Sequence, residues 1–103
     1  MHIGLCLPQL GGHVNRHGLR AFCEQAEKLG YGSLWVQEHI FYPLHPVSGY
    51  SARVDELCEE VARSRAAGVG AVIVDTNFDP ALDTPQRWAE VPRTLAPLLD
   101  AAA

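Results

Sequence analysis

"GAVIVDTNF", residues 70–78, is the stretch of this 103-residue chain that decides the fold. Residues 71–74 are continuously apolar, and polar residues follow directly after them. Continuous apolarity, as opposed to alternation, is typical of a strand covered on both faces, as in parallel sheets. The stretch therefore predicts a strand of a parallel sheet that has helices packed on it.

Helical patterns flank this strand on both sides. Before it, a helix is expected from near Ser51 to Gly68, because its acids come early and its arginines late, which suits the helix dipole. After it, residues 79–83 form a turn, Thr84 is an N-cap and Pro85 takes the first helical position. The last helix carries its apolar side chains at helical spacing, and Pro92 inside it is expected to kink or divide it.

The first half of the chain repeats the alternation. Residues 2–8, "HIGLCLP", predict a short buried strand, and residues 9–18 a loop. A helix over 19–29 ends at Gly30, and a second buried strand follows over 33–38. The irregular connection over 39–53 is long for a compact domain, which favours a binding segment or a lid.

This order of elements predicts one α/β domain over residues 1–103, with a three-stranded parallel sheet, right-handed crossovers and three helices. A sheet of three parallel strands has two open edges. Open edges promote pairing with another chain, so a homo-oligomer is expected.

The composition limits the partners. The formal net charge of −4 gives no electrostatic reason for binding nucleic acid or an anionic membrane, and no apolar run reaches the roughly 20 residues of a membrane span. The first residues lack a basic leader, which favours a cytoplasmic protein. Cys6, Cys23 and Cys58 show no CxxC spacing and are expected to be buried free thiols; the alternative is a disulfide or a redox role.

Three further segments resemble a known family: "MHIGLCLPQLGGHV", "FCEQAEKLGYGSLWVQEHI" and "YPLHPVSGYS". Together, residues 1–50 resemble the amino-terminal end of the bacterial luciferase-like monooxygenases, a family of flavin- and deazaflavin-dependent oxidoreductases. Residues 51–103 resemble the carboxy-terminal end of the same family. The resemblance implies a fragment of a TIM (β/α)8 barrel, a fold of roughly 250 residues, with the middle units absent and a join between Tyr50 and Val54. Because the last barrel strand lies beside the first, the implied strand order is 2-1-3.

The resemblance also implies a site. Glu38 and His39 stand where the family often has an Asp-His pair, so His39 would act as the catalytic acid or base beside Glu38. Gln9 and Gly11, after the first strand, would join His39 in binding FMN or a deazaflavin coenzyme. The family's coenzyme is held largely by loops that this chain lacks, which implies weak or no monooxygenase activity of a single chain, and weak or no coenzyme binding.

Simpler interpretations stand beside these. His39 is either a catalytic group or a hydrogen-bonded residue at a strand end, and no metal site is predicted, although His13 and His17 have a metal-binding spacing. Trp35 and Trp88 are expected to be core or interface anchors. Asp75 and Asp79 either touch a ligand or a cation, or are turn residues that cap the next helix. The functional alternative to an oxidoreductase is a non-enzymatic homodimeric interaction module or a vestigial remnant.

Overall fold

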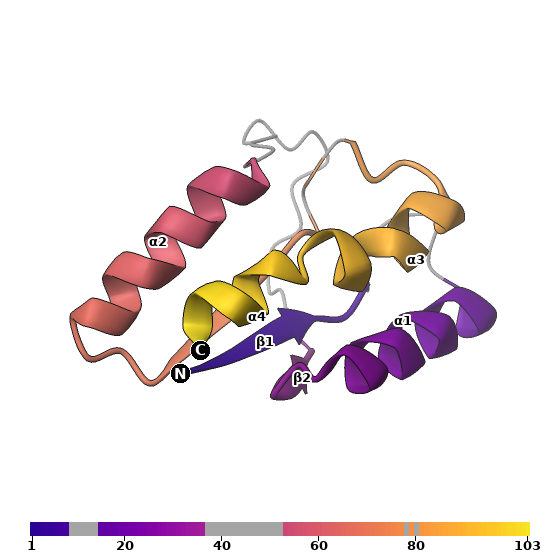
Figure 1. The fold of residues 1–103 in the computed structure, drawn as a ribbon. Coiled ribbons are helices and arrows are strands. Elements are labelled where there is room, and N and C mark those ends of the chain that lie inside the picture. Colours follow the sequence, from indigo (N-terminus) through magenta and orange to yellow (C-terminus); the bar gives the residue numbers. More distant parts are fainter. Residues whose placement is uncertain (9–14, 37–52, 78, 80) are drawn as a thin grey trace.

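The computed structural model describes residues 1–8, 15–36, 53–77, 79 and 81–103 (Figure 1). Strands and helices alternate along the chain, as predicted, and the α/β class is confirmed. In chain order, the elements are β1 (His2–Cys6), α1 (Arg16–Leu29), β2 (Ser33–Trp35), α2 (Val54–Ala66), β3 (Ala71–Val74), α3 (Pro85–Thr94) and α4 (Pro97–Ala102).

The three strands form one parallel sheet in the order β2-β1-β3, which confirms the predicted order. Leu5 lies opposite Leu34 on one side and Val74 on the other. β1 is therefore the central strand, and β2 and β3 are its edges. β2 is shorter than the strand predicted over 33–38; among the described residues it ends at Trp35.

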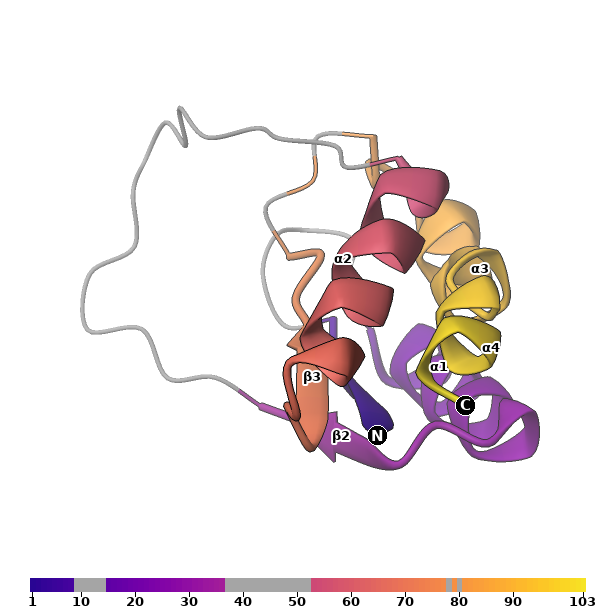
Figure 2. The same cartoon turned by 60° about the vertical axis from the view of Figure 1, so that its left-hand side comes forward.

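All four helices lie on one face of the sheet (Figure 2). Ile3 and Leu5 of β1 point into this layer and are about 1% exposed. They form a single core with residues from every helix, including Phe22 and Ala26 of α1, Val61 of α2, Trp88 and Val91 of α3, and Leu98 and Ala102 of α4. The prediction that Trp88 belongs to the core is confirmed.

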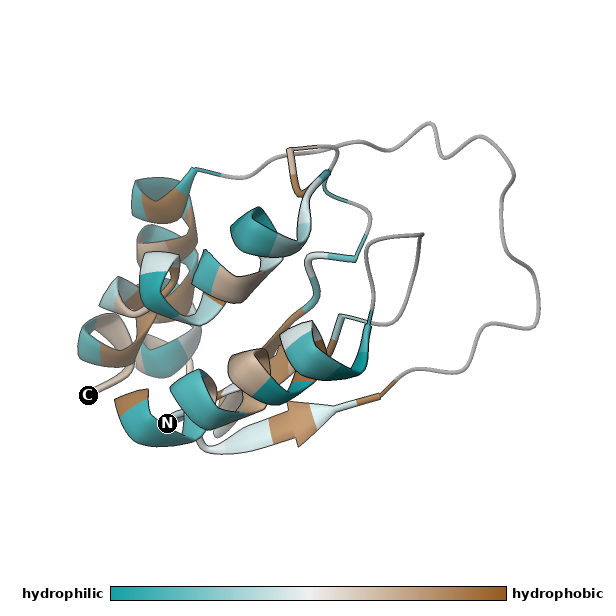
Figure 3. Cartoon of the chain, turned by 90° about the vertical axis from the view of Figure 1, so that its right-hand side faces the viewer, coloured by the Kyte–Doolittle hydropathy of each residue, from teal (hydrophilic) through white to brown (hydrophobic). Residues whose placement is uncertain are grey.

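The opposite face of the sheet is open among the described residues. Trp35 is 45% exposed and Ile73 42% exposed, and Figure 3 shows hydrophobic residues of β2 at the margin of the molecule. The prediction of a strand covered on both faces is wrong for β3, whose residues alternate between exposed and half-buried. The prediction of a buried second strand is also wrong, because Leu34 is 39% exposed. Both β2 and β3 are edge strands, and helices pack on only one face of each among the described residues.

Helix α1 begins earlier than predicted. The Asn15 side chain accepts a hydrogen bond from the Gly18 N–H at 2.7 Å, and this cap starts the helix at Arg16, inside the predicted loop. The predicted end at Gly30 is confirmed, with φ at +96°. Gly68, after α2, has φ at +89°, in the left-handed region that favours glycine at helix ends.

The last predicted helix is present as two helices, and the break differs from the one expected at Pro92. α3 continues through Pro92 to Thr94, and α4 starts at Pro97. Pro97 has no N–H to offer the Arg93 carbonyl, so the Ala96 N–H donates to that carbonyl at 3.2 Å. The Tyr31 hydroxyl donates to the Pro92 carbonyl, which would otherwise lack its helical donor.

None of the helices in the described part of the chain is long and apolar enough to cross a membrane.

Candidate functional site

The residues singled out by the family resemblance lie outside the described residues. This holds for Gln9, Gly11, Glu38 and His39, and for His13 of the histidine pair. His17 lies in the first turn of α1, whereas His13 is outside the described residues, so their relative position is not tested. The catalytic and coenzyme-binding roles therefore remain predictions.

The described strands do place the ends of β1 and β2 at one edge of the sheet. Cys6 pairs with Trp35, and the Leu7 N–H donates to the Trp35 carbonyl at 2.8 Å. The chain therefore leaves both strands from the edge where active sites of parallel α/β proteins are built.

Asn77 joins the ends of β1 and β3 at this same edge. Its Nδ2 donates to the Leu7 carbonyl at 3.1 Å and to Asp75 Oδ1 at 2.8 Å. Its N–H donates to the same Asp75 oxygen at 3.0 Å, which forms an Asx turn. Asn77 is the buried polar residue of the described core, and sequence reasoning missed it. The Asp-Thr-Asn pattern directly after an apolar strand is the signal that could have indicated it.

Asp79, the second acidic residue after β3, also accepts a turn hydrogen bond. Asp79 Oδ1 accepts from the Ala81 N–H at 2.9 Å. Asp75 and Asp79 both accept turn hydrogen bonds, as predicted, but the cap of the next helix is Thr84 and not either acid.

Cys6 is buried beside this edge. Burial raises the pKa of the Cys6 thiol, and the negative charge of Asp75 raises that pKa further. The thiol therefore stays protonated at neutral pH, which disfavours it as a nucleophile or metal ligand. All three cysteines are free; the predicted burial is confirmed for Cys6, whereas Cys23 and Cys58 are half-buried.

A chain of polar contacts on the open face runs from Trp35, at the carboxyl end of β2, to His2, at the start of β1. The Trp35 indole Nε1–H donates to Ser33 Oγ at 2.7 Å, and His2 Nε2 lies 2.9 Å from the same oxygen. Gly4 provides the room, because a Cβ built there would lie 2.9 Å from Trp35 Nε1. The Trp35 ring is thus held against the sheet with one side toward solvent, a geometry that suits an interface anchor.

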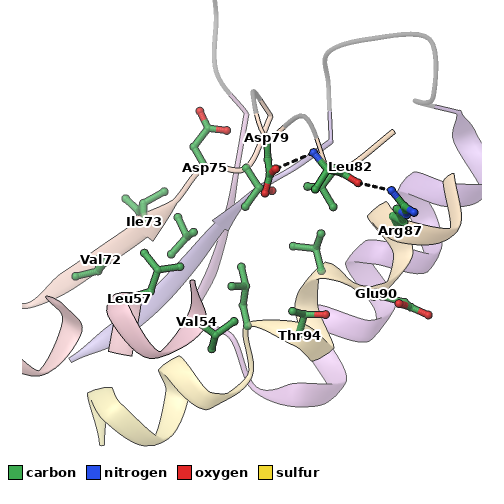
Figure 4. A pocket seen from close by; sticks show the side chains of 15 residues that line it. Val54, Leu57, Val72, Ile73, Asp75, Asp79, Leu82, Arg87, Glu90 and Thr94 are labelled. Carbon is green, nitrogen blue, oxygen red and sulfur yellow. Dashed lines mark hydrogen bonds between the residues drawn. The ribbon is translucent and has the colours of Figure 1, made fainter. Parts of the chain in front are cut away.

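A groove of about 710 Å³ lies between α2 and α3, with β3 along its floor (Figure 4). Its walls are mainly aliphatic: Val54 and Leu57 from α2, Val72, Ile73 and Val74 from β3, Leu82 from the connection, Val91 from α3, and Leu95 directly after α3.

Polar groups stand at the rim of this groove. Asp75, Asp79, Glu90 and Arg87 are its charged lining residues, three acids against one base. The Arg87 guanidinium donates to Asp83 Oδ1 at 2.8 Å and to the Ala81 carbonyl at 3.1 Å, so it is held toward the connection before α3. Within the described residues, no group of three or more histidines, cysteines or acids could hold a metal ion.

Comparison with known proteins found no match to this chain among protein-family models, curated proteins or solved structures.

Proposed function

We propose that this chain is a non-enzymatic homodimeric α/β module, in which a second copy covers the open face of the sheet. In this proposal the strands are the first, second and last strands of a luciferase-like (β/α)8 barrel, and a single chain has weak or no flavin- or deazaflavin-dependent activity. The order β2-β1-β3 supports the barrel origin, because a closed barrel places its last strand beside its first.

The observation that carries the proposal is the exposure of Trp35 and Ile73 on one sheet face. Exposed apolar patches of this kind are typical of protein–protein contacts. The edges β2 and β3 also present backbone groups without a neighbouring strand in the described sheet.

A second copy is the partner that best fits these features. A two-fold axis brings the same patch of both copies together, so one apolar face is enough for a self-complementary contact. The Trp35 indole is already fixed by Ser33, which lowers the ordering cost of using it as an anchor.

The test is the molar mass of the purified chain by light scattering at micromolar concentration. The wild type is expected at twice the mass of one chain. Ile73→Asp is expected to weaken self-association about tenfold or more, because it places an unpaired charge in the apolar contact.

Val69→Asp is the matched control. Val69 is 43% exposed, close to the value for Ile73, but it lies before the first residue of β3. The control variant should dimerise like the wild type. A monomeric wild type at micromolar concentration, or equal effects of both variants, contradicts the proposal.

A second candidate function is coenzyme binding by the assembled protein. It is favoured by the Asn77 contacts, which fix the end of β3 against Leu7 at the sheet edge where the resemblance places FMN or a deazaflavin. Titration of the dimer with each coenzyme should then quench the coenzyme fluorescence. Unchanged fluorescence with protein in the high micromolar range contradicts this second candidate and leaves the homodimeric module intact.

A further inference from the structure

We propose that the groove between α2 and α3 binds a small apolar molecule that carries a protonated amino group. The groove runs along β3 between α2 and α3, and Ile73, assigned above to the dimer contact, is one of its lining residues. The probes below are therefore read on α2 and on the connection before α3, which the proposed dimer contact does not include.

The groove has the size and lining of a ligand site. Its volume of about 710 Å³ lies inside the range of roughly 300–1,000 Å³ that ligand pockets occupy. The helix packing explains why it is there: α2 packs mainly on α4, whereas α3 packs mainly on α1. Small aliphatic residues, such as Val54 and Val72, do not fill the space left between α2 and α3.

The charges at the rim select the class of ligand. Asp75 and Glu90 lie at different sides of the opening in Figure 4, with Asp79 near Asp75. The one base, Arg87, is paired with Asp83, an acid outside the lining. The rim therefore keeps an excess of negative charge, in a chain whose formal net charge is −4. This field favours a cationic ligand and disfavours an anionic one.

The lining of the groove walls determines which apolar part the ligand should have. Apart from the charged residues at the rim, the polar residues of the described lining are Thr76 and the exposed Thr94, and the rest of this lining is aliphatic. A phenylalkyl or short alkyl chain matches this lining, and its terminal amine would remain at the acidic rim.

Three probes of the same shape test the inference on the full chain: 4-phenylbutylamine, 4-phenylbutanol and 4-phenylbutyrate. Each is titrated while the methyl resonances of the protein are followed by NMR. The amine should bind most tightly and the carboxylate about tenfold or more weakly, with shifts at Val54, Leu57 and Leu82.

Glu90→Gln removes one rim charge from an exposed position on α3. It should weaken binding of the amine about threefold to tenfold and leave binding of the alcohol unchanged. Glu59→Gln, at an exposed position of α2 outside the groove lining, makes the same chemical change and should alter neither.

Three results would overturn the inference. These are equal binding of amine and carboxylate, shifts confined to methyl groups outside the groove, and no shift with any probe. The molar mass of the wild type is measured separately, so these results are distinguishable from a failure of the proposed dimer.

Discussion

At the scale of single residues, Tyr31 supplies a hydrogen-bond donor to a carbonyl of α3 that would otherwise lack one. Its hydroxyl donates to the Pro92 carbonyl, 61 residues away, at the place where the helical pattern is broken. Burial raises the pKa of Tyr31 to about 12, because the ionised form would lose its hydration.

Tyr31→Phe should lower the free energy of unfolding by about 1 kcal/mol at pH 7, because the Pro92 carbonyl loses its donor. Urea denaturation measures this difference.

The difference in unfolding free energy between the wild type and Tyr31→Phe should depend on pH. The folded wild type keeps the Tyr31 proton up to about pH 12, whereas the unfolded chain loses it near pH 10. Between these values the unfolded state binds fewer protons, so the wild type loses stability as pH rises. Its advantage over Tyr31→Phe should therefore be present below pH 10 and shrink by about 1 kcal/mol or more toward pH 12. A constant difference across this window contradicts the assignment.

The local sequence predicted the helix caps but did not indicate the Tyr31 contact. Gly30 and Thr84 have roles that nearby sequence determines, and both were predicted correctly. Neither the Tyr31–Pro92 contact nor the Asn77–Leu7 contact could be predicted, because each joins residues at least 61 positions apart.

At the scale of elements, the start of α1 depends on one side chain. Asn15 accepts from the Gly18 N–H, which satisfies a donor that the first turn would leave without a helical partner. Asn15→Ala should destabilise the chain by about 1 kcal/mol. Asn15→Asp is the matched control and should be neutral or slightly stabilising, because a carboxylate also accepts this bond and suits the helix dipole. Equal losses in both variants, measured by thermal denaturation, would contradict the capping role.

Element order could be predicted more securely than element boundaries. Alternating strand and helix patterns restrict the topology, and the strand order followed from the resemblance to a barrel. The position of the break before Pro97 could not be predicted, because either Pro92 or Pro97 could interrupt the helical pattern. In the structure the missing N–H of Pro97 ends α3, whereas Pro92 is accommodated inside it.

At the scale of the whole molecule, the described residues form one layer of helices on the sheet and leave its other face open. Sequence reasoning expected both faces of β3 to be covered, since residues 71–74 are all apolar. In the structure the helices do not cover all apolar side chains of β3, and Ile73 is 42% exposed. In the proposed homodimer, the second copy would cover this exposed face. The predicted site residues, Gln9, Gly11, Glu38 and His39, lie outside the described residues, so the site rests on the resemblance.

The most direct test of this account is ¹⁹F NMR of the chain labelled with 5-fluorotryptophan. The label reports Trp35 on the open face and Trp88 in the core. On dilution from high to low micromolar concentration, the Trp35 resonance should move or split as a partner leaves the sheet, while the Trp88 resonance stays fixed. A Trp35 resonance that is solvent-sensitive and unchanged at every concentration would show that no second copy covers this face.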